Sequence, residues 1–239
     1  MRLALVALAT LALAGCETTE EKSAQLERVA KHSKHLAEAS EPLRALVGAP
    51  PSSKVKVQGT SVVHTSEGAA AVVWVRNTTG TTLHRIPILI EVKDAAGASV
   101  YTNNQVGISP SLTSVPSLPA GGSLEWVDDQ VQATGTPASV SATLGDGETG
   151  GGPASLPVKA SVSEQSANGG TVEGTVTNPT GAAQSEVVVY ATAHHGSELV
   201  AAGRAVVNEV PASGSSHFQL FLIGDPSGAA LRYSASPTS

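Results

Sequence analysis

Two separate stretches of the chain repeat one pattern of residues. In the first, AVVWVRNTTG (71–80) leads to IPILIEVKDAAGASVYT (86–102) and then to SLPAGGSLEW (117–126). In the second, TVEGTVTNPTG (171–181) leads to EVVVYATAHHGSELVAAG (186–203) and then to EVPASGSSHF (209–218). An internal repeat of this kind indicates two copies of one structural unit, each of which must form its own core.

Apolar and small or polar residues alternate on both sides of the NTTG and NPTG tetrapeptides, which is typical of half-buried β-strands joined by type I turns. The side chains expected to point inward are Val73, Val75, Ile86, Ile88, Ile90 and Val92 in the first copy and Val172, Gly174, Val176, Val187, Val189 and Ala191 in the second. Trp126 and Phe218, at matching positions, are the expected large anchors of the two cores.

Composition points in the same direction, because aromatic residues make up only 3% and charged residues 14%, while glycine occurs 24 times. Short strands separated by Gly/Pro turns favour β-sandwiches. The sequence therefore predicts an all-β fold of two tandem immunoglobulin-like sandwich domains, preceded by a signal peptide and a short N-terminal helix. The expected domains cover 53–144 and 156–239, and residues 145–155 (GDGETGGGPAS) form a flexible Gly-rich linker.

Both copies resemble the FxLYD family of bacterial envelope domains. The resemblance lies in the Asn…Gly turn, in the late PAGG and PASG turns before an aromatic residue, and in the segments 90–94 (IEVKD) and 191–195 (ATAHH) at the place of the family's motif. Of the motif itself, only Asp94 keeps the aspartate, and neither copy keeps the aromatic residues. The resemblance implies small sandwiches without enzymatic activity.

The N-terminus has the features of an export signal. Arg2 precedes the apolar run 3–13, which as a helix would measure ~16 Å, about half of the ~30 Å of a bilayer core. The following residues 13–16 (LAGC) resemble the lipobox of bacterial lipoproteins. That resemblance implies cleavage after residue 15, a diacylglycerol on the Cys16 thiol, and a new amino group that can take a further acyl chain such as palmitate. The alternative is a secreted protein with an incidental cysteine.

A lipidated Cys16 would tether the protein to the extracytoplasmic side of a cell membrane or outer membrane, since each buried acyl methylene contributes ~0.8 kcal/mol. Residues 16–52 are then a lipid-anchored stalk, with a helix expected from about 20 to 40 and a second short turn starting at Pro42. Membrane lipid is the expected partner, together with an envelope protein or glycan. The expected function is a non-enzymatic structural or interaction module of the cell envelope; the alternative is a lipoprotein that binds an extracellular glycan or other ligand.

Other classes of function find little support. The net charge of −6 argues against nucleic acid. The spacing Gly145-x-Gly147-x-x-Gly150 matches a dinucleotide loop, but no helix follows it. We expect no catalytic residues, no metal site and no cofactor. No serine lies in a nucleophile elbow, and the histidine pair 32/35 lacks further ligands. Glu198 lies close to His194 and His195, but adjacent histidines on a strand point to opposite faces.

The outer face of the first copy is more informative. If Val73 and Val75 point inward, Val72 and Trp74 point outward, and Leu89 with Pro87 does so on the next strand. We interpret Val72, Trp74 and Leu89 as a possible partner-binding face, since exposed apolar clusters are usually covered. The cover is either the N-terminal helix or the sister copy, or else an external partner or glycan.

Overall fold

The computed structural model describes residues 43–105 and 107–238. The signal peptide, Cys16, the expected helix from about 20 to 40 and the 32/35 histidine pair lie outside the described residues. Within them, the secondary structure consists of strands, a helical turn at 43–46 and the short 3-10 helix η1 (Pro110–Leu112). The predicted all-β sandwich fold is confirmed. No described helix has the length and apolar character needed to cross a membrane.

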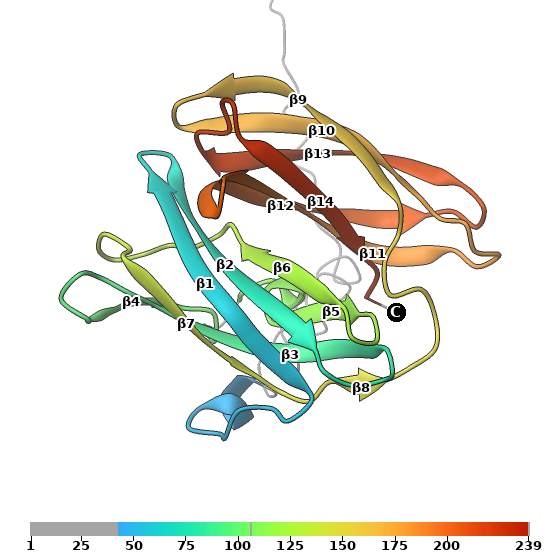
Figure 1. Cartoon of the computed structure of the whole chain (residues 1–239), viewed down its shortest axis with the longest axis horizontal. Helices are drawn as coiled ribbons and strands as arrows, with labels where there is room; N and C mark the ends of the chain where they lie inside the picture. The colour runs from blue at the N-terminus through green and yellow to red at the C-terminus, as the bar shows by residue number, and fades with distance from the viewer. Residues whose placement is uncertain (1–42, 106, 239) are drawn as a thin grey trace, which may run out of the picture. The chain divides into compact units, whose positions relative to one another are not determined.

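The first sandwich is built from two antiparallel sheets (Figure 1). One sheet has the order β1-β2-β6. The other is centred on β3, which pairs with β5 and β8 in its first half and with β4 and β7 in its second half. The strands are β1 (Val55–Thr65), β2 (Gly68–Asn77), β3 (Leu83–Lys93), β4 (Ser99–Thr102), β5 (Ser114–Leu118), β6 (Ser123–Asp128), β7 (Ser139–Leu144) and β8 (Glu148–Thr149).

The second sandwich is one six-stranded antiparallel sheet in the order β14-β11-β12-β13-β10-β9. Its β12 pairs with β13 at Ala201–Gly224 and Ala202–Ile223. Beyond these pairs the sheet separates into two layers, whose inward side chains share one core. The strands are β9 (Val158–Ser166), β10 (Gly169–Thr177), β11 (Gln184–His195), β12 (Glu198–Val210), β13 (Ser215–Gly224) and β14 (Ala230–Ser236).

The sequence repeat has a counterpart in strand register. Trp126 on β6 faces Val73 on β2, and at the matching place Phe218 on β13 faces Gly174 on β10. The predicted inward valines, isoleucines and Ala191 are all 0% exposed. The same unusual backbone also recurs: Arg85 in β3 has φ 44° and its counterpart in β11, Glu186, has φ 48°.

The turn asparagines explain why both copies keep the Asn-x-Thr-Gly pattern. The Asn77 amide nitrogen donates to the carbonyl oxygens of Thr81, Leu118 and Pro119 at 2.7, 3.2 and 3.0 Å, and its oxygen accepts from the backbone and hydroxyl of Thr79. The amide thus ties the turn after β2 to the end of β5.

Asn178 repeats these bonds in the second sandwich. Its amide nitrogen donates to Ala182, Val210 and Pro211 at 2.8, 3.2 and 3.0 Å, and its oxygen accepts from Thr180. Both asparagines are 0% exposed. Each asparagine therefore stabilises its turn through a fully buried amide.

The Gly-rich segment 145–155 connects the two sandwiches, but part of it is held by the first. Its β8 pairs with the start of β3, the Gly145 N–H donates to the Pro87 carbonyl at 2.8 Å, and Ser52 donates to Asp146 at 2.6 Å. The sequence predicts a flexible linker here, whereas a two-residue strand forms because β3 offers an unpaired edge at this point. The domain boundaries stay a prediction.

Candidate functional site

The second sandwich packs against the outer face of β2 and β6. Its β12 contacts β1, β2 and β6, and its β11 contacts β6. Val188, Tyr190 and Ala202 of the second sandwich belong to the same buried apolar cluster as Val72, which is only 5% exposed. Within the described residues, Val72 is thus covered by the sister copy, which is one of the covers that the sequence leaves open.

A largely buried ion pair connects the sandwiches at one end of this interface. The Arg204 Nε atom lies 3.0 Å from Oδ1 of Asp129, and the Arg204 backbone N–H donates to Oδ2 at 3.1 Å. The Arg204 side chain, 4% exposed, also donates from Nη1 to the Ser111 hydroxyl at 2.9 Å. Burial raises the pKa of the Asp129 carboxyl, although the Arg204 guanidinium opposes that shift.

Next to this pair, Asp128 is completely buried. Burial raises its pKa, while the hydrogen bond that Tyr101 donates at 2.7 Å and the Gln130 backbone N–H act in the opposite direction. Burial likewise raises the pKa of the Tyr190 hydroxyl. The interface therefore encloses acidic and phenolic groups in surroundings that disfavour their charged forms.

Glu125 on β6 forms a second connection between the sandwiches. Its Oε2 accepts from the Thr192 hydroxyl and lies 3.2 Å from Nε2 of His194, and its Oε1 accepts from Nη1 of Arg232 at 2.9 Å. Thr192 and His194 lie on β11 and Arg232 on β14. One carboxylate thus bonds side chains of two strands of the other sandwich, so both of its oxygens already have partners.

A third connection joins β5 to the end of the chain. The Ser117 backbone N–H donates to the Ser236 hydroxyl at 3.0 Å, that hydroxyl donates to the Ser117 carbonyl at 2.9 Å, and the Ser117 hydroxyl donates to the Ala154 carbonyl at 2.7 Å. These bonds and the apolar cluster hold the sandwiches in one arrangement.

Trp74 is the large apolar side chain of this face that stays open, at 46% exposed. It stands between Gly59 on β1 and Glu125 on β6, its direct neighbours in the sheet. Two hollows of about 210 and 500 Å³ meet at Trp74, Glu125 and Arg232, and we call them together the Trp74 cleft. Its remaining lining residues are Gln58, Gly59, Thr60, Ser61, Val72, Ser123, Leu124, Tyr190, Thr192, His194, Gly196, Ser197, Leu199, Tyr233 and Ser234.

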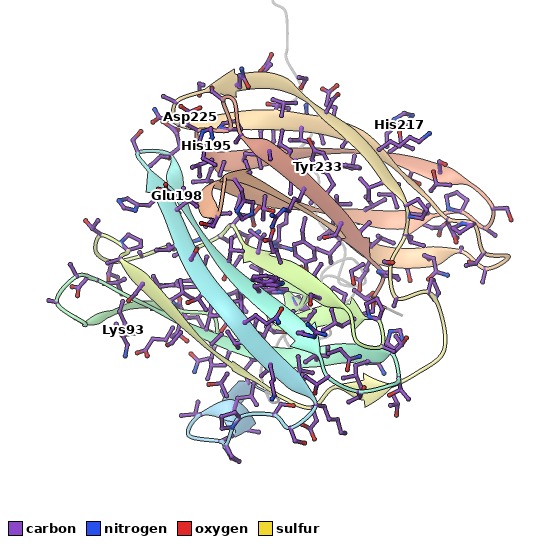
Figure 2. All side chains as sticks on the ribbon, in the orientation of Figure 1. Lys93, His195, Glu198, His217, Asp225 and Tyr233 are labelled. Carbon is purple, nitrogen blue, oxygen red and sulfur yellow. The ribbon has the colours of Figure 1, made fainter. Side chains whose placement is uncertain are left out.

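Figure 2 shows Tyr233 on β14, the strand that also supplies Arg232 to the cleft. Partial burial raises the pKa of the Tyr233 hydroxyl. The cleft therefore combines one open indole with hydroxyl groups and a compensated carboxylate, an arrangement suited to binding.

Of the predicted partner-binding residues, the structure brings Val72 and Trp74 together on β2 but not Leu89. Leu89 lies on β3, in the opposite sheet, between the inward-facing Ile88 and Ile90. Outward side chains of two packed sheets point to opposite sides of a sandwich, so Leu89 faces away from Trp74. Grouping the three residues requires β2 and β3 to share a sheet, and the structure places them in different ones.

The adjacent histidines of β11 point in different directions. His194 is 8% exposed and faces Glu125, whereas His195 is exposed near Glu198 and Asp225 at the outer end of β11 (Figure 2). Hydrogen bonds from Ser227 are the main cause that lowers the pKa of the Asp225 carboxyl. Within residues 43–105 and 107–238, no cluster of three His, Cys, Asp or Glu side chains could hold a metal ion.

Reasoning from the sequence missed the charged residues of the interface. Arg204 stands within the apolar run of β12. Glu125 precedes Trp126 on β6, and Asp129 directly follows the end of that strand. A charged residue inside an otherwise buried strand is the signal that could have identified Arg204, because such a charge requires a partner. The identity of that partner depends on how the sandwiches dock.

Comparisons with known proteins give the chain no family. No protein-family model matches it, and no curated protein matches it either. Among solved structures it is similar to the crystal structure of red sea bream transglutaminase, with 16% sequence identity and a TM-score of 0.27. That match covers 78% of this chain and 29% of the transglutaminase chain.

Proposed function

We propose that the protein is a lipid-anchored, non-enzymatic interaction module of a bacterial cell envelope, made of tandem FxLYD-like sandwiches on the extracytoplasmic side of a cell membrane or outer membrane. The observation that carries the proposal is the lipobox-like segment 13–16 (LAGC), which ends in the chain's single cysteine. Two or more acyl chains on Cys16 would hold the protein stably at a membrane surface.

The described part of the chain suits such a role. Its interface carboxylates and Arg204 bond one sandwich to the other, which is a structural use of these groups. A rigid pair of sandwiches presents a fixed surface at the end of the stalk to an envelope protein or glycan.

Metabolic labelling with an alkyne-tagged fatty acid tests the anchor. The natural chain should take up the label and separate with the membrane fraction, and Cys16→Ala should lose both properties. A Ser23→Ala variant, changed just outside the lipobox-like segment, is the matched control and should label like the natural chain. Equal labelling of Cys16→Ala would refute the anchor.

A second candidate function is ligand binding at the Trp74 cleft. The observation that favours it is the 46% exposure of Trp74 at the junction of two hollows, on a face whose neighbouring Val72 is buried. Tryptophan is among the side chains most enriched where proteins bind partners.

A further inference from the structure

The charge balance of the Trp74 cleft limits what it can bind. The Glu125 carboxylate is its acidic group, and Arg232 neutralises it with a hydrogen bond of 2.9 Å. Since a carboxylate can only accept, Nε2 of His194 carries the hydrogen in their 3.2 Å contact. The compensated pair leaves no net charge to attract an anion or a cation, so an uncharged ligand fits best.

The shape around the indole points to a flat ligand. A Cβ added at Gly59 would lie 4.0 Å from Cε3 of Trp74. Because Gly59 has no side chain, β1 does not cover the ring on this side. On the other side, hydrogen bonds from Thr192 and Arg232 hold the Glu125 carboxylate. The indole therefore lies where two hollows meet, one lined by Gly59 of β1 and the other by Ser123 and Leu124 of β6.

The polar groups of the cleft are mainly hydroxyls. Ser61 and Ser197 line the larger hollow and Ser123 and Ser234 the smaller one, and Gln58 adds an amide at the edge of the larger. Hydroxyl and amide groups can both donate and accept hydrogen bonds. The larger hollow, about 500 Å³, falls within the size range of ligand pockets.

We propose that the Trp74 cleft binds an uncharged saccharide chain, one pyranose ring stacking on the indole of Trp74 and its neighbours entering the two hollows. A pyranose has an apolar face of C–H groups and a rim of hydroxyls, which match an indole surrounded by hydroxyl and amide side chains. This inference rests on the ligand-binding function proposed above and names the class of ligand.

Tryptophan fluorescence provides the test, because of the two tryptophans in the chain Trp126 is fully buried and Trp74 is open. The full chain with Cys16→Ser is titrated with neutral trisaccharides (chitotriose, cellotriose, maltotriose) and with trigalacturonate as the anionic comparison. We expect a saturable change in emission with at least one neutral trisaccharide and a weaker response to trigalacturonate.

The variants Trp74→Ala and Trp74→Phe test whether the ligand binds at Trp74. Because both variants lack the fluorescent indole of the cleft, their affinities are measured by isothermal titration calorimetry. Trp74→Ala should weaken binding about tenfold or more, and Trp74→Phe should weaken it less because a ring remains. No saturable change with any neutral trisaccharide, stronger binding of trigalacturonate, or full affinity in Trp74→Ala would each overturn the proposal. Fatty-acid labelling at Cys16 is a separate measurement. A failure of saccharide binding is therefore distinguished from a failure of the proposed lipid anchor.

Discussion

Arg204 and Asp129 join the two sandwiches through a largely buried ion pair, with the guanidinium Nε 3.0 Å from Oδ1 of the carboxylate. Breaking such a pair leaves the remaining charge buried without a partner, which costs more than the pair contributes. We expect Arg204→Met to lower the free energy of unfolding by about 3 kcal/mol, measured by urea denaturation.

Two further variants test that interpretation. The double variant Arg204→Met with Asp129→Asn should regain much of the loss, because it removes the unpaired carboxylate. Glu148→Gln, which breaks the exposed pair between Arg85 and Glu148, should cost less than about 1 kcal/mol. If Arg204→Met costs no more than Glu148→Gln, the buried pair does not hold the interface.

The turn asparagines Asn77 and Asn178 allow the same substitution to be compared in the two sandwiches. Asn77→Ala and Asn178→Ala each leave three buried or part-buried carbonyl oxygens without the amide donor. Each substitution should lower the free energy of unfolding by about 3 kcal/mol, and the two values should agree closely because the bonds are equivalent. Asn104→Ala, outside these turns, is the control. A large difference between the two turn variants would contradict the structural equivalence of the copies.

Asp128 predicts a dependence of stability on pH. Because burial raises its pKa, the folded state binds the proton more tightly than the unfolded state, and the charged carboxylate destabilises the fold above its folded pKa. Asp128→Asn should therefore be more stable than the natural chain at neutral pH, and the difference should shrink as the pH falls through that pKa.

The asparagine carbonyl can still accept from the Gln130 N–H, and its amide nitrogen can donate to the Tyr101 oxygen, which reverses the direction of the natural bond from Tyr101. Urea denaturation at several pH values measures the difference, with the exposed Glu209→Gln as control. The opposite result, in which Asp128→Asn is less stable than the natural chain at neutral pH and gains relative stability in acid, would contradict a raised pKa of Asp128.

Gly174 sits where the second sandwich leaves no room for a side chain. A Cβ there would lie 2.6 Å from the Lys159 carbonyl oxygen and 2.7 Å from both Ala160 Cβ and Phe218 Cζ. Gly174→Ala should therefore cost about 1–3 kcal/mol in thermal or urea unfolding. Gly181→Ala, where a Cβ would meet nothing within 4 Å, should be close to neutral. Equal effects of the two changes would show that the β10 position is not crowded.

Local patterns sufficed to predict the strands and the cores, because alternation decides which face of a strand is buried. Ile86, Ile88 and Ile90 are buried as that alternation requires. The repeat predicted equivalent turns, and Asn77 and Asn178 make equivalent bonds.

The residues of the Trp74 cleft and of the interface come from strands that are distant in the sequence, so their positions depend on how the sheets and the sandwiches pack. Alternation predicts that Leu89 and Trp74 both point outward, but consecutive strands of a sandwich can belong to opposite sheets, and β2 and β3 do. Glu125, Arg204 and Arg232 come together only when one sandwich docks on the other, and neither periodicity nor spacing encodes that docking. The anchor at Cys16 stays a prediction from the sequence.

The two sandwiches dock in one fixed arrangement, and this docking creates the Trp74 cleft. Pulsed dipolar spectroscopy between two spin labels measures the distance between the sandwiches directly. The labels are attached to cysteines that replace the exposed Ala96 of the first sandwich and the exposed Ala183 of the second, in the full chain with Cys16→Ser. We predict a single narrow distance distribution that broadens in Arg204→Met. A broad or multimodal distribution in the chain with Arg204 intact would contradict the fixed docking and the cleft that depends on it.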